Sequence, residues 1–509
     1  MSEHGIGDLY TGKMYLKRRE WRGVNDTAYD FWRWLITWKD LTRFAMSSPV
    51  RITKALFTYR WMASYLTTPA FIDRHSMGLR GTALRINHLH FNTVIKNTTV
   101  LIATLFKADR RFGDNKLADK IVLFDEMMPQ QIMAGFPNLI GIASQVAPIF
   151  QCSVIDQQSM IPYLDAIENY GLPADVCPLP ASEAGASILD DYPIVGKCYI
   201  TSSMPCDGSV MASSFQDRYF KLPTFPLALP VRYLEKEVEQ YAVEDLKDCI
   251  AFIEEHTGEK FDWDNYFRCM KQYNREAEYE LEKWDINKTD CPQITGASLA
   301  LYRMYAFLVA GSMDKRFLKT DAKVNKLMLR AFERREKCSR EMRHRAVVWS
   351  PPAHYYSNFA TWAENCWGIN VLIDMESLVS TKFFNTEDRE ESLKDLAHTY
   401  ERMTMRRHTN GGYVNVLDEL WRVCAEFNAD VVLMFAHISC KTMAGLTGLF
   451  EDQAREHHIH LIWIDHDLMD PRTVSRKDMR NNVNRYMQTV FREEPVDATL
   501  VDFDDEKTW

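Results

Sequence analysis

The stretch Asp430–Lys441 constrains the fold more than any other part of this sequence. Its apolar run, Val431–Phe435, has the length of one buried strand and ends in a polar turn that carries Cys440. A helical pattern follows over Met443–Glu456, and then a second strand-like run. This order favours a parallel α/β sheet, in which functional groups gather at the carboxyl ends of the strands. The sequence therefore places the Cys440 thiol at a functional edge of a sheet.

Length and composition are those of an ordinary globular protein with several domains. The chain has 509 residues, of which 46% are hydrophobic and 26% charged. Its net charge of −9 argues against a general nucleic-acid binder, which normally carries a basic balance. No apolar run reaches the roughly eighteen residues of a membrane span, and the first residues lack the layout of a signal peptide. We expect a cytoplasmic protein that has no membrane partner and whose eleven cysteines are mostly reduced.

Residues 1–117 show apolar side chains at helical spacing and are predicted to form a helical N-terminal region. One of its helices carries an aromatic face, opposite to Arg33 and Thr37. This face consists of Phe31, Trp34, Leu35 and Trp38. Aromatic side chains at this density could bind a flat ligand, but we interpret the face as a core or subunit contact. His88 and His90 do not share a helix face, so we assign them to ordinary packing or surface use and not to a metal site.

The remainder of the chain is predicted to form two α/β domains around a charged helical connector. The first α/β domain covers residues 118–235, the connector covers 236–344, and the second α/β domain covers 345–509. The strands expected in the second domain are Ala346–Trp349, Asn370–Ile373, Val431–Phe435 and Leu461–Ile464. Helical patterns alternate with these strands, which favours a parallel, doubly wound sheet. The predicted fold class is therefore α/β, with two parallel-sheet domains, a helical N-terminal region and a helical connector.

Three of the eleven cysteines stand in turn-rich settings. Cys177 precedes Pro178, Cys206 precedes Asp207-Gly208, and Cys440 follows a strand. Rigid loops of this kind leave backbone amides free to donate hydrogen bonds to the sulfurs of a cluster. No close Cys-x-x-Cys pair occurs, so neither a zinc knuckle nor a ferredoxin loop is indicated. From the residues alone, a shared metal site and an incidental trio of loop cysteines both remain open.

Several motifs, taken in order, resemble the 2-hydroxyacyl-CoA dehydratase family, whose D-component subunits include relatives in benzoyl-CoA reductase. The motifs are Asp125–Gly135, Val176–Gly185, Cys206-Asp-Gly, His437-Ile-Ser-Cys-Lys441 and Arg472–Met487. The resemblance covers about residues 118–495. It implies that each subunit of a heterodimer folds as two flavodoxin-like domains with additional helices.

The resemblance also implies a cofactor and a reaction. Cys177, Cys206 and Cys440 would hold one 4Fe–4S cluster between the domains, with one iron open to the acyl-CoA substrate. A separate ATP-hydrolysing iron–sulfur activator would donate a single electron, and the complex could also carry a flavin. The reaction would be the oxygen-sensitive elimination of water from a 2-hydroxyacyl-CoA through a ketyl radical. A benzoyl-CoA reductase-type subunit and a non-catalytic electron-relay partner subunit are the alternatives.

Two further residues are candidates for catalysis. Glu126, after the first predicted strand, could be a general base or an iron ligand, and it could equally cap the helix expected near Pro129. His437 could hydrogen-bond to the substrate or the cluster, or it could be satisfied locally at its strand end. The N-terminal region of about 117 residues is long for the family, and the resemblance assigns it no role.

Overall fold

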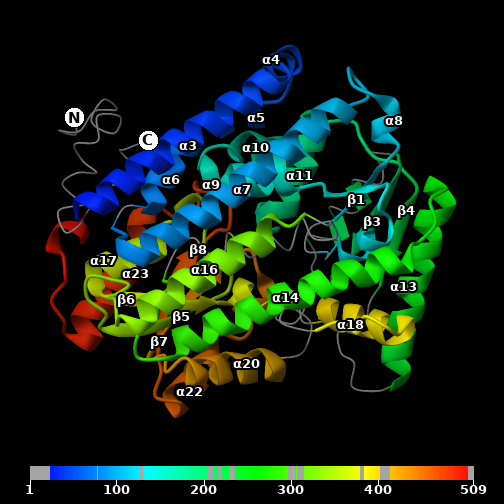
Figure 1. Ribbon diagram of the computed structural model, residues 1–509. Helices are drawn as coiled ribbons and strands as arrows, with labels where there is room; N and C mark the ends of the chain where they lie inside the picture. The colour runs from blue at the N-terminus through cyan, green and yellow to red at the C-terminus, as the bar shows by residue number, and fades with distance from the viewer. Residues whose placement is uncertain are drawn as a thin grey trace.

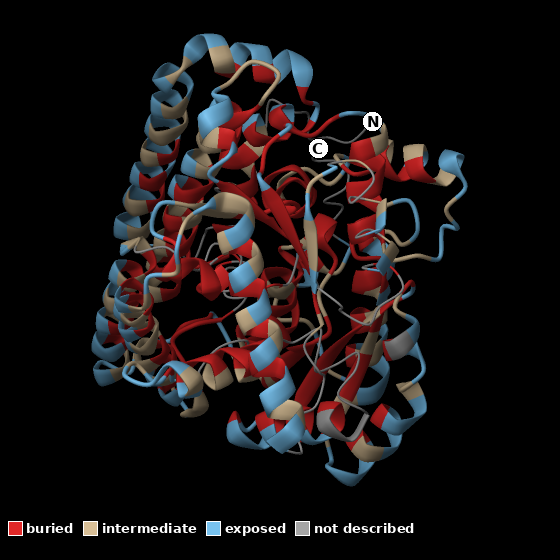
Figure 2. Cartoon of the chain, turned by 90° about the vertical axis from the view of Figure 1, so that its right-hand side faces the viewer, coloured by how far each residue is buried: buried red, intermediate tan, exposed pale blue. Residues whose placement is uncertain are grey.

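Two parallel sheets of four strands each organise the chain (Figure 1). The computed structural model describes residues 23–76, 78–125, 128, 130–202, 208, 210–211, 214–215, 219, 221–228, 236–295, 302, 305, 314–378, 383–401 and 413–502. The strands are buried beneath helices, whose outward faces are exposed (Figure 2). The predicted α/β class with two parallel sheets is confirmed.

The first sheet has the strand order β2-β1-β3-β4. Its strands are β1 (Ile121–Phe124), β2 (Ile140–Ala143), β3 (Cys198–Ser202) and β4 (Thr224–Leu227). The sequence did not single out β2 and β4, which are the two edge strands. Gly141 interrupts one of them and Pro226 the other, and a proline is tolerated on an edge because it need not donate to a neighbour. The run Leu229–Tyr233, which the sequence also predicts as a strand, lies outside the described residues.

The second sheet has the order β6-β5-β7-β8. Its strands are β5 (His344–Trp349), β6 (Ile369–Asp374), β7 (Val431–His437) and β8 (His460–His466). All four correspond to strands expected from the sequence. Helices α17 (Phe359–Trp367) and α23 (Arg476–Tyr486) pack against one face of this sheet, and α20 (Tyr413–Glu426) and α22 (Thr447–Glu456) pack against the other. Both faces are therefore covered, which explains the nearly continuous apolar runs of its strands.

Three long helices follow the first sheet, namely α13 (Lys236–Thr257), α14 (Trp263–Lys288) and α16 (Arg316–Glu333). Helix α14 joins the two units, because Tyr266 and Met270 belong to the core of the first sheet and Trp284 to that of the second. Helix α18 (Arg389–Glu401) lies between β6 and β7 in the chain but packs against α13. Its residues Leu393 and Leu396 belong to the core of the first sheet. The chain thus returns to the first unit after it has begun the second.

The N-terminal region is helical, as expected, over the residues that the structure describes. Its elements are α3 (Val24–Ser47), α4 (Pro49–Thr58), α5 (Trp61–Ser64), η1 (Tyr65–Thr67), α6 (Thr68–Ser76), α7 (Gly81–Ala108) and α8 (Asn115–Ala118). Short helices elsewhere are η2 (Gln130–Gly135), η3 (Val146–Gln151), α9 (Cys152–Ile155), α10 (Ile161–Tyr170), α11 (Pro178–Ile188), η4 (His354–Tyr356), η5 (Met375–Leu378), α21 (Lys441–Ala444), η6 (Met487–Phe491) and η7 (Ala498–Leu500). In the described part of the chain, no helix is long and apolar enough to cross a bilayer.

Helix α3 has the reverse of the orientation expected for an amphipathic helix. Arg33 is only 2% exposed and contacts the carboxylates of Asp30 and Asp73. His88 Nε2 lies 3.1 Å from the same Asp30 carboxylate, so this histidine has the packing role expected for it. The aromatic face points outward instead, with Phe31 61% exposed. The expectation of a core contact is wrong, because Arg33 pairs with Asp30 and Asp73 on the inner side of α3. The alternative expectation of a subunit contact stays a prediction.

Removing Arg33 should destabilise the protein strongly. An Arg33→Ala variant removes the cation that contacts buried Asp30 and half-buried Asp73, and loss of one partner of a buried ion pair costs about 3–5 kcal/mol. Arg43→Ala, at an exposed position of the same helix, should cost less than about 0.5 kcal/mol. Urea denaturation followed by tryptophan fluorescence measures both, and equal losses would contradict a stabilising role for the buried network.

Candidate functional site

The carboxyl ends of the two sheets face each other across a packed contact. Ser153, in the short helix α9 that comes after β2, has its Oγ 2.8 Å from Nδ1 of His354. His354 follows β5 of the second sheet, and its ring meets that of Phe150 edge-on with centroids 4.7 Å apart. In open parallel sheets, ligands bind at this edge where the strand order reverses. The reversals lie between β1 and β3 in one sheet and between β5 and β7 in the other.

Cys177 lies at the start of α11, on the first unit. It is half-buried and is the residue that precedes the first turn of this helix, where Pro178 suits the helical start. The positive end of a helix dipole favours a thiolate over a thiol. A Cβ atom placed on Gly208 would lie 3.4 Å from Cys177 Cβ and 2.6 Å from Pro180 Cγ, so the backbone of Gly208 lies directly against Cys177. Cys206 is two residues before Gly208 and lies outside the described residues.

Cys440 lies in the turn between β7 and α21, on the second unit. It is half-buried, and its backbone N–H donates to the carbonyl of His437 over 2.9 Å, which closes the turn. The next residue, Lys441, places its Nζ 3.3 Å from Oδ2 of Asp175. Both side chains of this ion pair are largely exposed, so it adds little stability. It shows, however, that the turn of Cys440 lies beside the loop that leads to Cys177.

The donor chemistry of these thiols suits an iron–sulfur cluster. Among the ten cysteines that the structure describes, seven are buried and only Cys177, Cys291 and Cys440 are half-buried. Burial raises the pKa of Cys269 to about 11 and that of Cys424 to about 12, so these remain thiols at neutral pH. Cys177 and Cys440 are less buried than these thiols and come from opposite units. The described residues contain no complete group of three metal-ligating side chains, and a third thiol would have to come from the loop of Cys206.

A buried polar cluster lies at the carboxyl edge of the first sheet. Ser144 Oγ donates to Oε1 of Glu183 over 2.7 Å, and Gln145 donates to both Glu183 and Asp125. Glu183 is 2% exposed, and burial together with the nearby Asp125 raises its pKa to about 8. It therefore holds a proton at neutral pH. Sequence reasoning missed Glu183, although it is the only charged residue in the otherwise small and apolar helix α11.

His437 lies in a group of buried imidazoles at the edge of the second sheet. It is 6% exposed, and its ring centroid lies 5.4 Å from that of His466. Burial lowers the pKa of His437 to about 4, and burial together with the nearby imidazole of His437 lowers the pKa of His354 to about 3. These rings are neutral at pH 7. The other candidate, Glu126, lies outside the described residues, while its neighbour Asp125 belongs to the cluster with Gln145.

The fold and the site define a two-unit α/β protein with cysteine turns at facing sheet edges. The family described as 2-hydroxyglutaryl-CoA dehydratase, D-component, matches residues 133–489 of the chain, which is 357 of its 509 residues. The chain belongs to this family, and the resemblance inferred from its motifs is confirmed. The family is named for one component of a dehydratase, a lyase, which implies a partner component in a complex. A search among curated proteins finds no match. Helices α3 to α8 precede the matched range.

The pH dependence of stability should reveal Glu183. An unfolded glutamate ionises near its ordinary pKa of 4.5, whereas folded Glu183 ionises near 8. Between these values the folded chain binds a proton that the unfolded chain has lost, so stability falls as pH rises from about 4.5 to 8. Glu183→Gln cannot ionise and should gain stability relative to the parent as pH rises through this window. Urea denaturation at pH 5, 6.5 and 8 measures this difference.

The exposed glutamate Glu255 on α13 provides the matched control. A Glu255→Gln variant should keep the pH profile of the parent. If Glu183→Gln also keeps that profile, Glu183 is not a buried, protonated carboxyl.

Proposed function

We propose that this chain is the iron–sulfur subunit of an oxygen-sensitive 2-hydroxyacyl-CoA dehydratase that works in the cytoplasm. The observation that carries the proposal is the approach of two half-buried cysteine turns from opposite units, marked by the Lys441–Asp175 ion pair. Membership of the dehydratase family gives these turns a chemical context. A second, related subunit would complete the heterodimer, and an ATP-hydrolysing iron–sulfur activator would supply one electron.

Cys177, Cys206 and Cys440 would hold a 4Fe–4S cluster. When bound, the cluster would supply a Lewis-acidic iron for the acyl-CoA and a relay for the single electron. The helix start at Cys177 favours its thiolate form, and Pro178 and Pro180 stiffen the first turn of α11. Gly208 allows the loop of Cys206 to approach, because any side chain there would collide with Pro180.

The protein must also handle protons during the loss of water. A 2-hydroxyacyl thioester that has gained one electron becomes a ketyl radical anion, which can expel the neighbouring hydroxyl group. The resulting radical has a far more acidic β-proton, so a weak base suffices to remove it. His437 is neutral at pH 7 and can accept a proton on its ring, and Glu126 is the second candidate base. Returning the electron after this step completes the elimination.

Iron analysis tests the role of the three cysteines. The parent purified without oxygen should contain about four irons per chain, the number in one 4Fe–4S cluster. Cys177→Ala, Cys206→Ala and Cys440→Ala should each lose iron and the brown colour. Cys269→Ala and Cys424→Ala replace buried thiols of helices α14 and α20 and should keep both. An iron-free parent, or three site variants with the iron content of the parent, would refute the proposal.

Activity assays of the same purified parent and variants identify the reaction. Together with its partner subunit and activator, the parent should release water from 2-hydroxyacyl-CoA thioesters, and the Cys177→Ala, Cys206→Ala and Cys440→Ala variants should not. Reduction of aryl-CoA thioesters in place of dehydration would identify a benzoyl-CoA reductase-type subunit instead.

A further inference from the structure

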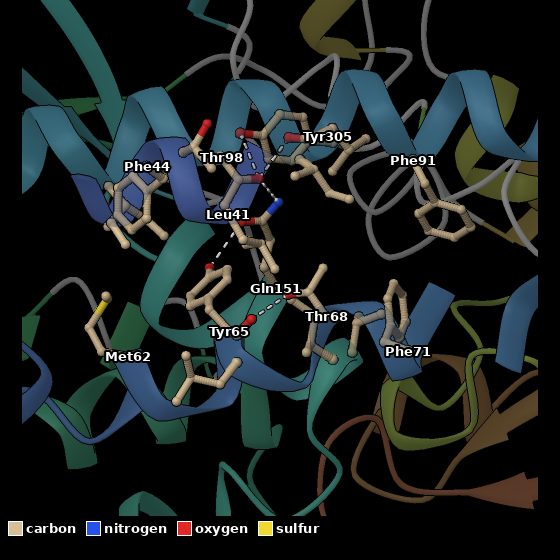
Figure 3. Close-up of a pocket in the computed structure, with 18 of the residues that line it drawn as sticks. Leu41, Phe44, Met62, Tyr65, Thr68, Phe71, Phe91, Thr98, Gln151 and Tyr305 are labelled. Carbon is tan, nitrogen blue, oxygen red and sulfur yellow. Dashed lines mark hydrogen bonds between the residues drawn. The ribbon is translucent and has the colours of Figure 1, made fainter. Parts of the chain in front are cut away.

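The N-terminal helices enclose an apolar cavity of about 260 Å³ (Figure 3). Its wall combines helices that precede the family match with η3 of the first α/β unit. Representative lining residues are Leu41 and Phe44 from α3, Phe71 from α6, Phe91 and Ile95 from α7, and Phe150 from η3. A wall of this composition matches the general character of small-molecule sites, which are mostly apolar with a few polar groups.

Several polar side chains in the wall bond to one another or to the backbone. Tyr65 donates to the carbonyl of Ala147 over 2.7 Å and lies 3.0 Å from Oε1 of Gln151. Gln151 Nε2 donates to Thr98 Oγ1 over 2.8 Å, and Thr98 is within 3.4 Å of the Tyr305 hydroxyl. Figure 3 shows this chain of contacts between α7 and η3. Polar groups engaged in this way make no demand on a ligand, so the interior suits a hydrocarbon.

The cavity opens to solvent beside the exposed aromatic face of α3. Trp38 belongs both to that face and to the cavity wall and is 42% exposed. Leu56 and Leu66 also line the cavity and are exposed. Phe31 stacks on Trp34, and Trp34 meets Trp38 edge-on, so an apolar track leads along α3 to the opening.

The most exposed charges of the two helices beside this opening are cationic. On α3 and α4 the exposed charged side chains are Lys39, Arg43 and Lys54, whereas the acidic side chain of Asp40 is half-buried. Lys39 directly follows the wall residue Trp38, and Arg43 directly follows Thr42, which also lines the cavity. The whole chain carries a net charge of −9, so a cationic rim here departs from its general balance. An anion would be attracted to the opening.

We propose that this cavity binds an anionic amphiphile, with its hydrocarbon body inside and its anionic head at the rim of Lys39 and Arg43. A cavity of about 150 Å³ holds the six carbons of benzene, so one of 260 Å³ holds on the order of ten carbons. The ligand class is thus a medium-chain carboxylate or an anionic lipid with a chain of that length. The proposal stands independently of the dehydratase reaction.

A series of straight-chain carboxylates tests the cavity. In titration calorimetry with the full chain, affinity should rise about fourfold per added methylene from hexanoate to decanoate. It should stop rising for chains longer than the cavity accommodates. Decanol, which has the same body without the charge, should bind more weakly than decanoate. An affinity independent of chain length, or no binding of decanoate, would overturn the proposal.

Variants locate the binding to this cavity. Ala45→Trp places a large ring at an exposed position of the wall and should abolish decanoate binding, whereas Ala251→Trp, at an exposed position of α13, should not. Lys39→Glu combined with Arg43→Glu should weaken decanoate severalfold and leave decanol unchanged. Arg455→Glu, on the distant helix α22, should affect neither. Decanoate binding that survives Ala45→Trp would overturn the assignment.

Two further measurements test whether this face binds a membrane or a second copy of the chain instead of a single ligand molecule. Phosphatidylglycerol vesicles test whether the face binds a membrane instead of a single ligand molecule. A cavity that takes up single ligand molecules should bind decanoate when no vesicles are present. Sedimentation of the chain with vesicles, without any binding of decanoate, would show a membrane-docking face and overturn the cavity site. A parent dimer in size-exclusion chromatography that Ala45→Trp converts to a monomer would show that a second copy covers the face, and would also overturn it.

Discussion

The contact between the two carboxyl edges is the constraint on which the rest of the site depends. Ser153 and His354 meet there from opposite sheets, and helix α14 extends from one apolar core to the other. An α-helix has a fixed rise per residue, so its length sets a separation that side chains alone could not maintain. Thiols on separate units can share one ligand only while that separation is held. The geometry of the cysteines is therefore a property of the whole chain and not of their loops.

Strand order accounts for the positions of the turns of Cys177 and Cys440. In the chain, Cys206 follows β3 and Cys440 follows β7. Each of these strands borders the point where the strand order of its sheet reverses. Neighbouring connections leave in opposite directions at such a point, which opens a crevice at the strand ends. Cys177 reaches the same region differently, from a loop that leads into a helix. The first unit thus contributes a helix start at Cys177 and the loop after β3, and the second unit contributes the turn after β7.

The sequence predicted those parts of the fold that depend on local patterns. The strands of the second sheet are continuous apolar runs, whereas Gly141 and Pro226 concealed the edge strands of the first. The aromatic face of α3 was recognised, but its direction was not, because Asp73 and His88 come from other helices and their pairing with α3 decides which side is buried.

The site shows the same division between local and distant information. Motifs identified the cysteines, while the approach of Lys441 to Asp175 depends on residues far apart in the chain. The sequence did not identify Glu183, because its hydrogen-bond donors Ser144 and Gln145 follow β2, about forty residues earlier in the chain.

The return of α18 to the first unit has a consequence for synthesis. Leu393 and Leu396 complete the core around the first sheet, yet the ribosome makes them only after β5 and β6. Until then the first sheet lacks part of its cover, and an N-terminal fragment that ended before β5 would expose the apolar surface that α18 protects. Domains normally fold as they emerge, beginning from the N-terminus. Here the first unit must wait for part of the second, so the two units mature together rather than in succession.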